Sequence, residues 1–156
     1  MVCSGQWTVS RPTFRNILVP VDGSAPSRRA VRVAAALARR LKARITGLHV
    51  ITPFEAHAYG EVLPAVITLE AFERHARKTA ERILAALRKA AAGVPCECRT
   101  VWETSAADAI VNAARIHRCG LIVMASHGRR GLERMLAGSV TQAVLAKSRV
   151  PVVVCH

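Results

Sequence analysis

Short apolar runs alternate with longer amphipathic segments along most of this chain. The clearest runs, Ile17–Val21 and Leu121–Met124, contain no charged side chain and are followed by small or polar residues. An uninterrupted apolar run of this length is typical of a strand that is buried on both faces. The intervening segments carry apolar residues at helical spacing, and parallel strands require such crossover connections. The alternation therefore predicts a mostly parallel sheet covered by helices.

The pattern predicts a single doubly wound, Rossmann-like α/β domain with five strands and about four helices. Strands are expected at residues 17–21, 44–50, 96–101, 121–124 and 150–154. Helices are expected over about 25–41, 68–92, 104–117 and 139–147, with apolar stripes at Ala30, Val33, Ala34, Leu37 and Leu41 in the first and at Phe72, Ala76, Ile83, Leu87 and Ala90 in the second. The domain is expected to span residues 14–156, after a polar N-terminal arm at 1–13. A long connection at 51–66 is a candidate cover for a site.

The chain is strongly basic, with 23 Lys and Arg against 10 Asp and Glu, a net charge of +13. Such a surface attracts phosphates, nucleic acid or anionic lipid. Because the basic residues are spread along the predicted helices, solvated helix faces are favoured over a nucleic-acid surface. The five cysteines form no CxxC pair, and no stretch is long and apolar enough to span a membrane. We expect a reduced, cytoplasmic protein without membrane association.

The segment after the fourth predicted strand carries the most informative chemistry. The residues at positions 125, 126 and 128 are the small residues Ala125, Ser126 and Gly128. The last predicted helix then begins at Gly138 and Ser139. A helix N-terminus offers amides without intrahelical acceptors, so Gly138, Ser139 and Val140 are placed to bind a phosphate. The segment matches neither the Walker A loop nor the GxGxxG fingerprint. On spacing alone, glycines that only form turns remain the alternative.

Several segments, in this order, resemble the universal stress protein family. They are ILVPVDGS at 17–24, LHV at 48–50, LIVMASHGRRG at 121–131, AGSV at 137–140 and VPVVV at 150–154. The resemblance covers about residues 14–156 and implies an adenine-nucleotide alpha hydrolase-like fold. Members that bind ATP carry G-x2-G-x9-G-S/T, and this chain supplies Gly128 and, after nine residues, Gly138 and Ser139. Ala125 stands where the first glycine of that pattern would be.

The resemblance implies ATP, alone or with Mg²⁺, as the ligand. It carries the phosphate contacts over to Gly128, Gly138, Ser139 and Val140, and the adenine and ribose contacts to Pro20, Val21, Asp22, Val50 and Met124, with Ala125 beside them. The Asp22 carboxylate is suited to accept a hydrogen bond from adenine or ribose, and a helix-capping carboxylate in an Asp-Gly turn is the alternative. Ala125 is strained only if its φ is positive.

The expected function is a nucleotide-dependent regulatory module with little or no hydrolysis. No catalytic residue is assigned, because His127 beside Ser126 has no adjacent third group to orient it. The alternative is a nucleotide-free interaction protein of the same family that binds nucleic acid or an acidic partner through its basic surface. The strand at 150–154 is expected at a sheet edge, and in the family this strand commonly forms a homodimer.

Overall fold

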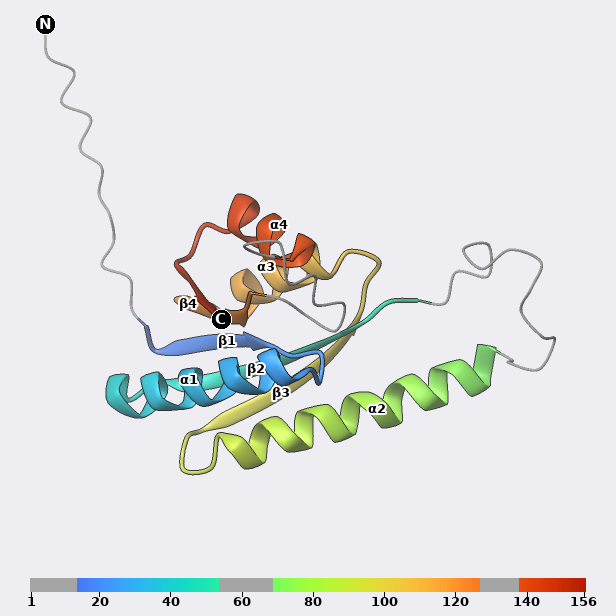
Figure 1. The fold of residues 1–156 in the computed structure, drawn as a ribbon, viewed down its shortest axis with the longest axis horizontal. Helices are drawn as coiled ribbons and strands as arrows, with labels where there is room; N and C mark the ends of the chain where they lie inside the picture. The colour runs from blue at the N-terminus through green and yellow to red at the C-terminus, as the bar shows by residue number, and fades with distance from the viewer. Residues whose placement is uncertain (1–13, 54–68, 127–137) are drawn as a thin grey trace, which may run out of the picture.

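A computed structural model describes residues 14–53, 69–126 and 138–156 (Figure 1). In this part of the chain five strands form one sheet, namely β1 (Asn16–Pro20), β2 (Arg44–Ile51), β3 (Cys96–Trp102), β4 (Leu121–Ala125) and β5 (Val152–Cys155). The helices are α1 (Ala25–Leu41), α2 (Leu69–Ala90), α3 (Ala106–Ile116) and α4 (Ser139–Lys147). Most of the connection expected at 51–66 lies outside the described residues. The predicted doubly wound α/β fold is confirmed.

The strands are ordered β3-β2-β1-β4-β5, and each neighbouring pair is parallel. The chain moves from β1 outward to β2 and β3, then returns to place β4 on the other side of β1. This reversal is a topological switch point, where ligands of open α/β sheets bind beyond the carboxyl ends of the strands. Asp22 follows β1 and Ser126 follows β4, so both predicted segments lie at the switch point.

Helices cover both faces of the sheet, with α1 and α2 on one side and α3 and α4 on the other (Figure 1). Successive residues of a strand point to opposite faces. Accordingly Ile17 and Val19 pack under α1 and α2, whereas Leu18 packs under α3 and α4. All three side chains are fully buried, as the uninterrupted apolar run predicted. Within the described segments, the helices are too short or too polar to cross a membrane.

Helix α1 has the expected bounds, Ala25–Leu41, but its buried face differs from the expected stripe. The Ser24 hydroxyl accepts a hydrogen bond from the Ser27 amide at 3.2 Å, as an N-cap residue should. Ala30, Val31, Ala34, Ala35 and Ala38 form the buried face. Val33 and Leu41, expected in the stripe, are 39% and 43% exposed. Val33 lies on the flank of that face, and Leu41 is the last residue of the helix. The contact with the sheet is instead made mainly by small alanine side chains.

Helix α2 is buried mainly through its C-terminal half. Ala80, Leu84 and Leu87 are buried, and of these only Leu87 belonged to the expected stripe. Ala90 is exposed, and Phe72 and Ala76 are half-buried. The N-terminal half extends past the sheet (Figure 1), where Phe72 meets the Trp102 ring at the end of β3 with a centroid separation of 6.4 Å. An apolar spacing in the sequence cannot show how far a helix extends beyond its sheet.

Candidate functional site

The predicted site residues of the described segments lie together at the carboxyl edge of the sheet. The Val21 amide donates to the Leu48 carbonyl at 2.8 Å, which fixes the end of β1 beside β2. The Gly138 amide donates to the Ser126 carbonyl at 2.6 Å, which fixes the start of α4 beside the end of β4. This edge therefore holds Pro20, Val21, Asp22, Val50, Met124, Ala125, Gly138, Ser139 and Val140. Gly128 lies outside the described residues.

Asp22 forms part of the turn that leads from β1 into α1. Its Oδ1 accepts a hydrogen bond from the Ser24 amide at 2.9 Å, and Gly23 has the positive φ of 82° that this turn requires. Asp22 thus forms the Asp-Gly turn of the alternative interpretation, whereas the N-cap residue of α1 is Ser24. A carboxylate has about four acceptor positions, so the bond to Ser24 orients Asp22 and is compatible with additional bonds to a ligand.

Arg28 adds a positive charge beside the same turn. Its guanidinium donates to the Gly23 carbonyl at 2.7 Å from the first turns of α1. This bond stabilises the conformation of the turn from the side of the helix. The candidate edge thus combines the Asp22 carboxylate with a cation that the sequence did not single out for this role.

His49 positions the end of β1, a role that was not predicted for it. The residue is buried, at 8% exposure, and its Nδ1 lies 2.7 Å from the Val21 carbonyl oxygen. Because a carbonyl can only accept, Nδ1 carries the hydrogen of this bond. The side chain therefore links β2 to the backbone directly before Asp22. A single histidine within an apolar strand was the only signal in the sequence.

The N-terminus of α4 faces the carboxyl edge with few groups of its own to cap it. Gly138 is the N-cap residue, with φ −68° and ψ 160°, and has no side chain to accept from the first turn. The first-turn amides, including those of Ser139 and Val140, have no intrahelical acceptor by the geometry of a helix. Both residues are exposed. Donors and the positive end of the helix dipole thus meet at one point, which suits an anion.

Thr141 holds this first turn against the sheet. Its side chain is buried, at 3% exposure, and its hydroxyl lies 3.0 Å from the Ala125 carbonyl oxygen and 3.2 Å from that of Ser126. Thr141 was not among the predicted site residues, because a threonine in the first turn of a helix shows no special role without its partners. The contact fixes the amides of Ser139 and Val140 relative to β4.

Ala125 adopts an ordinary strand conformation, which resolves the question that the missing glycine raised. It is the last residue of β4, and the non-glycine residues with positive φ in the described segments are Lys42 and Arg118. Alternation along β4 also places its methyl group on the face that carries Val123, which is covered by α1 and α2. Helix α4 covers the other face, so alanine neither strains the backbone nor points toward the α4 amides.

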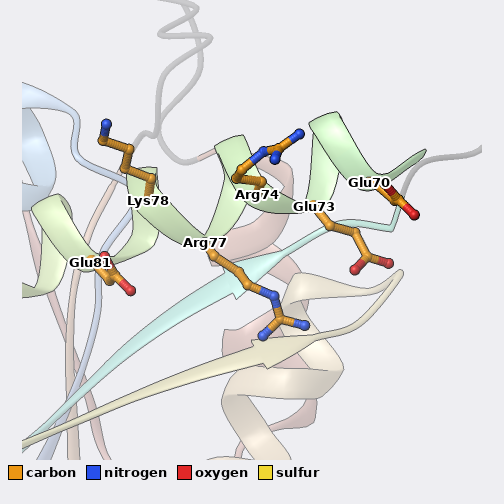
Figure 2. Close-up of a pocket in the computed structure, with 6 residues that line it drawn as sticks. All are labelled: Glu70, Glu73, Arg74, Arg77, Lys78 and Glu81. Carbon is orange, nitrogen blue, oxygen red and sulfur yellow. The ribbon is translucent and has the colours of Figure 1, made fainter. Parts of the chain in front are cut away.

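Open hollows of the described surface lie away from this edge. One, of about 490 Å³, follows the exposed side of α2 (Figure 2) and is lined by Glu70, Glu73, Arg74, Arg77, Lys78 and Glu81. Its three acidic and three basic side chains balance, and Arg77 lies 5.5 Å from the centre of the Trp102 ring. We assign this hollow to a solvated helix face. A second hollow lies at the opposite edge of the sheet.

The fold and this edge define a class of protein, namely a doubly wound α/β domain with an anion-accepting helix N-terminus at the switch point. The sequence model of the Universal stress protein family matches residues 13–156. The chain belongs to the universal stress protein family.

Individual relatives agree with this assignment. Universal stress protein MJ0531 of Methanocaldococcus jannaschii is 30% identical over 144 residues, which cover 90% of this chain and 81% of that protein. The structure of universal stress protein UspA from Lactobacillus plantarum has a TM-score of 0.70 at 26% identity and covers 92% of this chain and 98% of its own. The universal stress protein of Archaeoglobus fulgidus in complex with dAMP has a TM-score of 0.64 at 23% identity, over 92% and 99% of the two chains.

Proposed function

We propose that this protein binds an adenine nucleotide, ATP in particular, at the carboxyl edge of its sheet. The observation that carries the proposal is the fixed position of the α4 N-terminus, which Thr141 and the Gly138 amide tie to the end of β4. Two points of support come from outside the site. The chain belongs to the universal stress protein family, and a protein of the same fold from Archaeoglobus fulgidus holds dAMP.

The phosphates are proposed to bind at the start of α4. The amides of Ser139 and Val140 supply donors, and the helix dipole favours negative charge at this end. Gly138 leaves the approach open because it has no side chain. Gly128 is proposed to add a backbone contact, as the family pattern implies.

The adenosine part is proposed to bind at the ends of β1, β2 and β4. The Asp22 carboxylate accepts from a ribose hydroxyl or the adenine amino group, while Val50 and Met124 supply apolar contact to the base. Pro20 and Val21 form the backbone edge against which the base lies. His49 keeps the Val21 carbonyl, and so this edge, in place.

Mg²⁺, if it accompanies ATP, is proposed to arrive on the phosphates. No group of three or more His, Cys, Asp or Glu side chains in the described segments is placed to hold a metal ion. Mg²⁺ commonly keeps several waters and binds through substrate phosphates with one or two carboxylates, and Asp22 is the acidic residue that we place at this edge. The donor set thus fits a nucleotide-borne ion better than a resident one.

The protein is proposed to act in the cytoplasm as a regulatory module, with little or no hydrolysis. Efficient hydrolysis needs a base that orients the attacking water. Asp22 is held in its turn by the Ser24 amide, and we assign it to ligand binding. Nucleotide occupancy would then change which partner the protein binds.

A homodimer through β5 is proposed on the geometry of the sheet edge. The carbonyls of Pro151 and Cys155 accept from β4, so alternation directs the backbone of Val153 to β4 as well. The backbone groups of Val152 and Val154 then face outward from the edge strand. An outward row of backbone donors and acceptors is a template for pairing with a second copy.

The substitution Gly138→Asp tests the nucleotide site. The N-cap backbone of Gly138 is open to any residue, and Asp is a favoured N-cap residue, so the fold should be retained or gain roughly a few tenths of a kcal/mol. The new carboxylate, however, would occupy the anion position and repel phosphate. We expect calorimetric titration to show ATP binding to wild type and at least a tenfold weaker affinity for the variant.

Gly138→Asn is the matched control, since it caps the helix with similar shape and no charge. It should retain more affinity than Gly138→Asp at equal melting temperature. Nucleotide released from the heat-denatured wild-type protein would identify the ligand directly. Absence of released nucleotide, together with no ATP binding at millimolar concentration, would refute the proposed function.

A further inference from the structure

A second open hollow lies at the amino ends of the strands, at the edge opposite α4's N-terminus. It measures about 1020 Å³, and its lining residues come from the start of β1, the α1–β2 turn, residues 93–95 before β3 and the turn before β4. None of these lining residues is acidic or aromatic. Five are exposed cations, namely Arg15, Arg39, Lys42, Arg44 and Arg118. We call these five residues the amino-edge cluster.

The sheet brings the amino-edge cluster together from distant parts of the chain. The Arg44 amide donates to the Arg15 carbonyl at 3.0 Å, so the starts of β1 and β2 lie side by side. The Gly120 amide donates to the Asn16 carbonyl at 3.0 Å, which places the turn containing Arg118 next to β1 on its other side. The cations thus extend over the starts of three adjacent strands, a width of about 10 Å at the usual strand spacing.

Helix ends explain only part of this cluster. Arg39 lies in the last turn of α1, where a cation complements the helix dipole, and it donates to the Ala92 carbonyl at 2.9 Å. Lys42 is the C-cap residue of α1 and Arg118 follows the C-cap residue of α3, so both also lie at helix C-termini. Arg15 and Arg44 instead lie at the starts of strands, and sheets have only small net dipoles. The helix-dipole explanation therefore does not apply to these two residues.

Two members of the cluster occupy backbone conformations that favour glycine. Lys42 and Arg118 have φ values of 51° and 50°, and they are the non-glycine residues with positive φ in the described segments. This region is costly for a residue with a Cβ atom. Both line the same hollow. The chain thus carries cationic side chains where glycine would relax the backbone.

Among the residues that the structure describes, no acidic side chain lines the hollow. Glu97, one residue into β3, forms an ion pair with Arg99 and does not line the hollow. Like charges held at one edge repel one another, and an added anion relieves that repulsion. The net charge of +13 strengthens attraction of a polyanion at long range.

We infer that the amino-edge cluster binds the phosphate backbone of double-stranded nucleic acid without reading its sequence. Guanidinium groups match phosphate geometry, and four of the five cations are arginines. Each strand of a duplex carries one phosphate per about 3.4 Å of the helix axis, so about 10 Å of one strand presents roughly three phosphates to these five cations. Single strands are bound chiefly by stacking on aromatic side chains, and the lining offers none.

The test measures binding of the full chain to a short fluorescent duplex of random sequence over a range of salt concentrations. The hollow variant carries Lys42→Gly, Arg44→Gln and Arg118→Gly. The control variant carries Arg29→Gln, Arg32→Gln and Arg74→Gln, which are exposed residues of α1 and α2 outside the hollow. Both variants lose three positive charges, so a difference in affinity between them depends on where the removed charges lie and not on the net charge.

We expect wild type to bind with an affinity that falls steeply with salt. Each lost phosphate contact lowers the slope of log K against log salt by about 0.9, so the hollow variant should show a slope shallower by about 2.7 and an affinity about 100-fold or more lower at 0.1 M salt. The control should keep the wild-type slope and lie within about tenfold of its affinity. Glycine suits positions 42 and 118, so the melting temperature of the hollow variant should not fall.

Several results would overturn the inference. Equal weakening of both variants would show that only the overall charge matters. Tighter binding of a single strand than of the duplex, or binding of inorganic polyphosphate without binding of the duplex, would assign the hollow to another ligand. If the hollow variant unfolds, Arg44→Gln alone must still reduce the salt slope by about 0.9. Gly138→Asp should leave duplex binding unchanged, so this test is independent of the proposed nucleotide site.

Discussion

Replacing Thr141 by valine tests the contact that fixes the start of α4. Valine has nearly the shape of threonine but lacks the hydroxyl that contacts the Ala125 and Ser126 carbonyls at 3.0 and 3.2 Å. Ser126 retains the bond from the Gly138 amide, so the loss falls mainly on the Ala125 carbonyl. A buried acceptor left without its donor costs about 1–3 kcal/mol. For a domain of this size that lowers the melting temperature by roughly 2–4 °C per kcal/mol.

Thermal and chemical denaturation of the wild-type and Thr141→Val proteins would measure this loss, which we expect near 2 kcal/mol, the middle of that range. Thr141→Ser keeps the hydroxyl and loses one methyl group, so it should be less destabilised than Thr141→Val. Nucleotide affinity should fall with Thr141→Val as well, because the first-turn amides lose their attachment to β4. A valine variant as stable as wild type would refute the role given to Thr141.

Three further predictions concern the sheet and its edges. The hydrogen bond between the Cys96 and Cys98 sulfurs, which lie 4.0 Å apart, and the charge of Arg88 lower the pKa of Cys98 to about 7 despite its partial burial. The Cys98 thiolate should therefore persist down to about pH 7. The pH dependence of its alkylation, followed by peptide mass, should have a midpoint there and not near pH 9. Val154→Pro removes an outward-facing backbone amide of β5, so it should convert a dimer that is paired through β5 into monomers, whereas Val154→Thr should leave the dimer intact. Light scattering would measure the molecular mass of both variants. An unchanged mass of Val154→Pro would reject β5 as the interface. Gly47→Ala would place a Cβ atom 2.8 Å from the Leu87 Cδ1 atom and 3.3 Å from the Cys98 sulfur. Urea denaturation should therefore show a fold destabilised by about 1–3 kcal/mol. Equal denaturation midpoints of wild type and variant would show that the Leu87 side chain moves aside without cost.

The amino-edge cluster illustrates how charge spread along a sequence can gather in a fold. Most basic residues do lie on exposed helix faces, as Arg29 and Arg32 do, and the sequence favoured that description for all of them. Arg15, Arg44 and Arg118 are far apart in the chain, yet they line one hollow. The grouping depends on strand order, which no local pattern contains.

Local features of the sequence determined the elements of this protein and several of their ends. The apolar run at 17–21 predicted a buried strand because a strand between two helical layers meets apolar groups on both faces. The expected helix start near residue 25 agrees with α1, and Gly138 and Ser139 predicted the start of α4, because capping depends on neighbouring residues. Even the placement of Asp22 at the carboxyl edge followed from its position after β1.

Tertiary structure alone decided which of these parts meet. The Thr141 contact with Ala125, the His49 contact with Val21 and the ordinary φ of Ala125 all depend on how β4 and α4 pack and how β2 pairs with β1. The exposed flank of α1 and the extension of α2 past the sheet were likewise fixed by packing. Such contacts join residues distant in sequence, so they are set by the strand order and crossovers of the whole domain, which short-range periodicity does not encode.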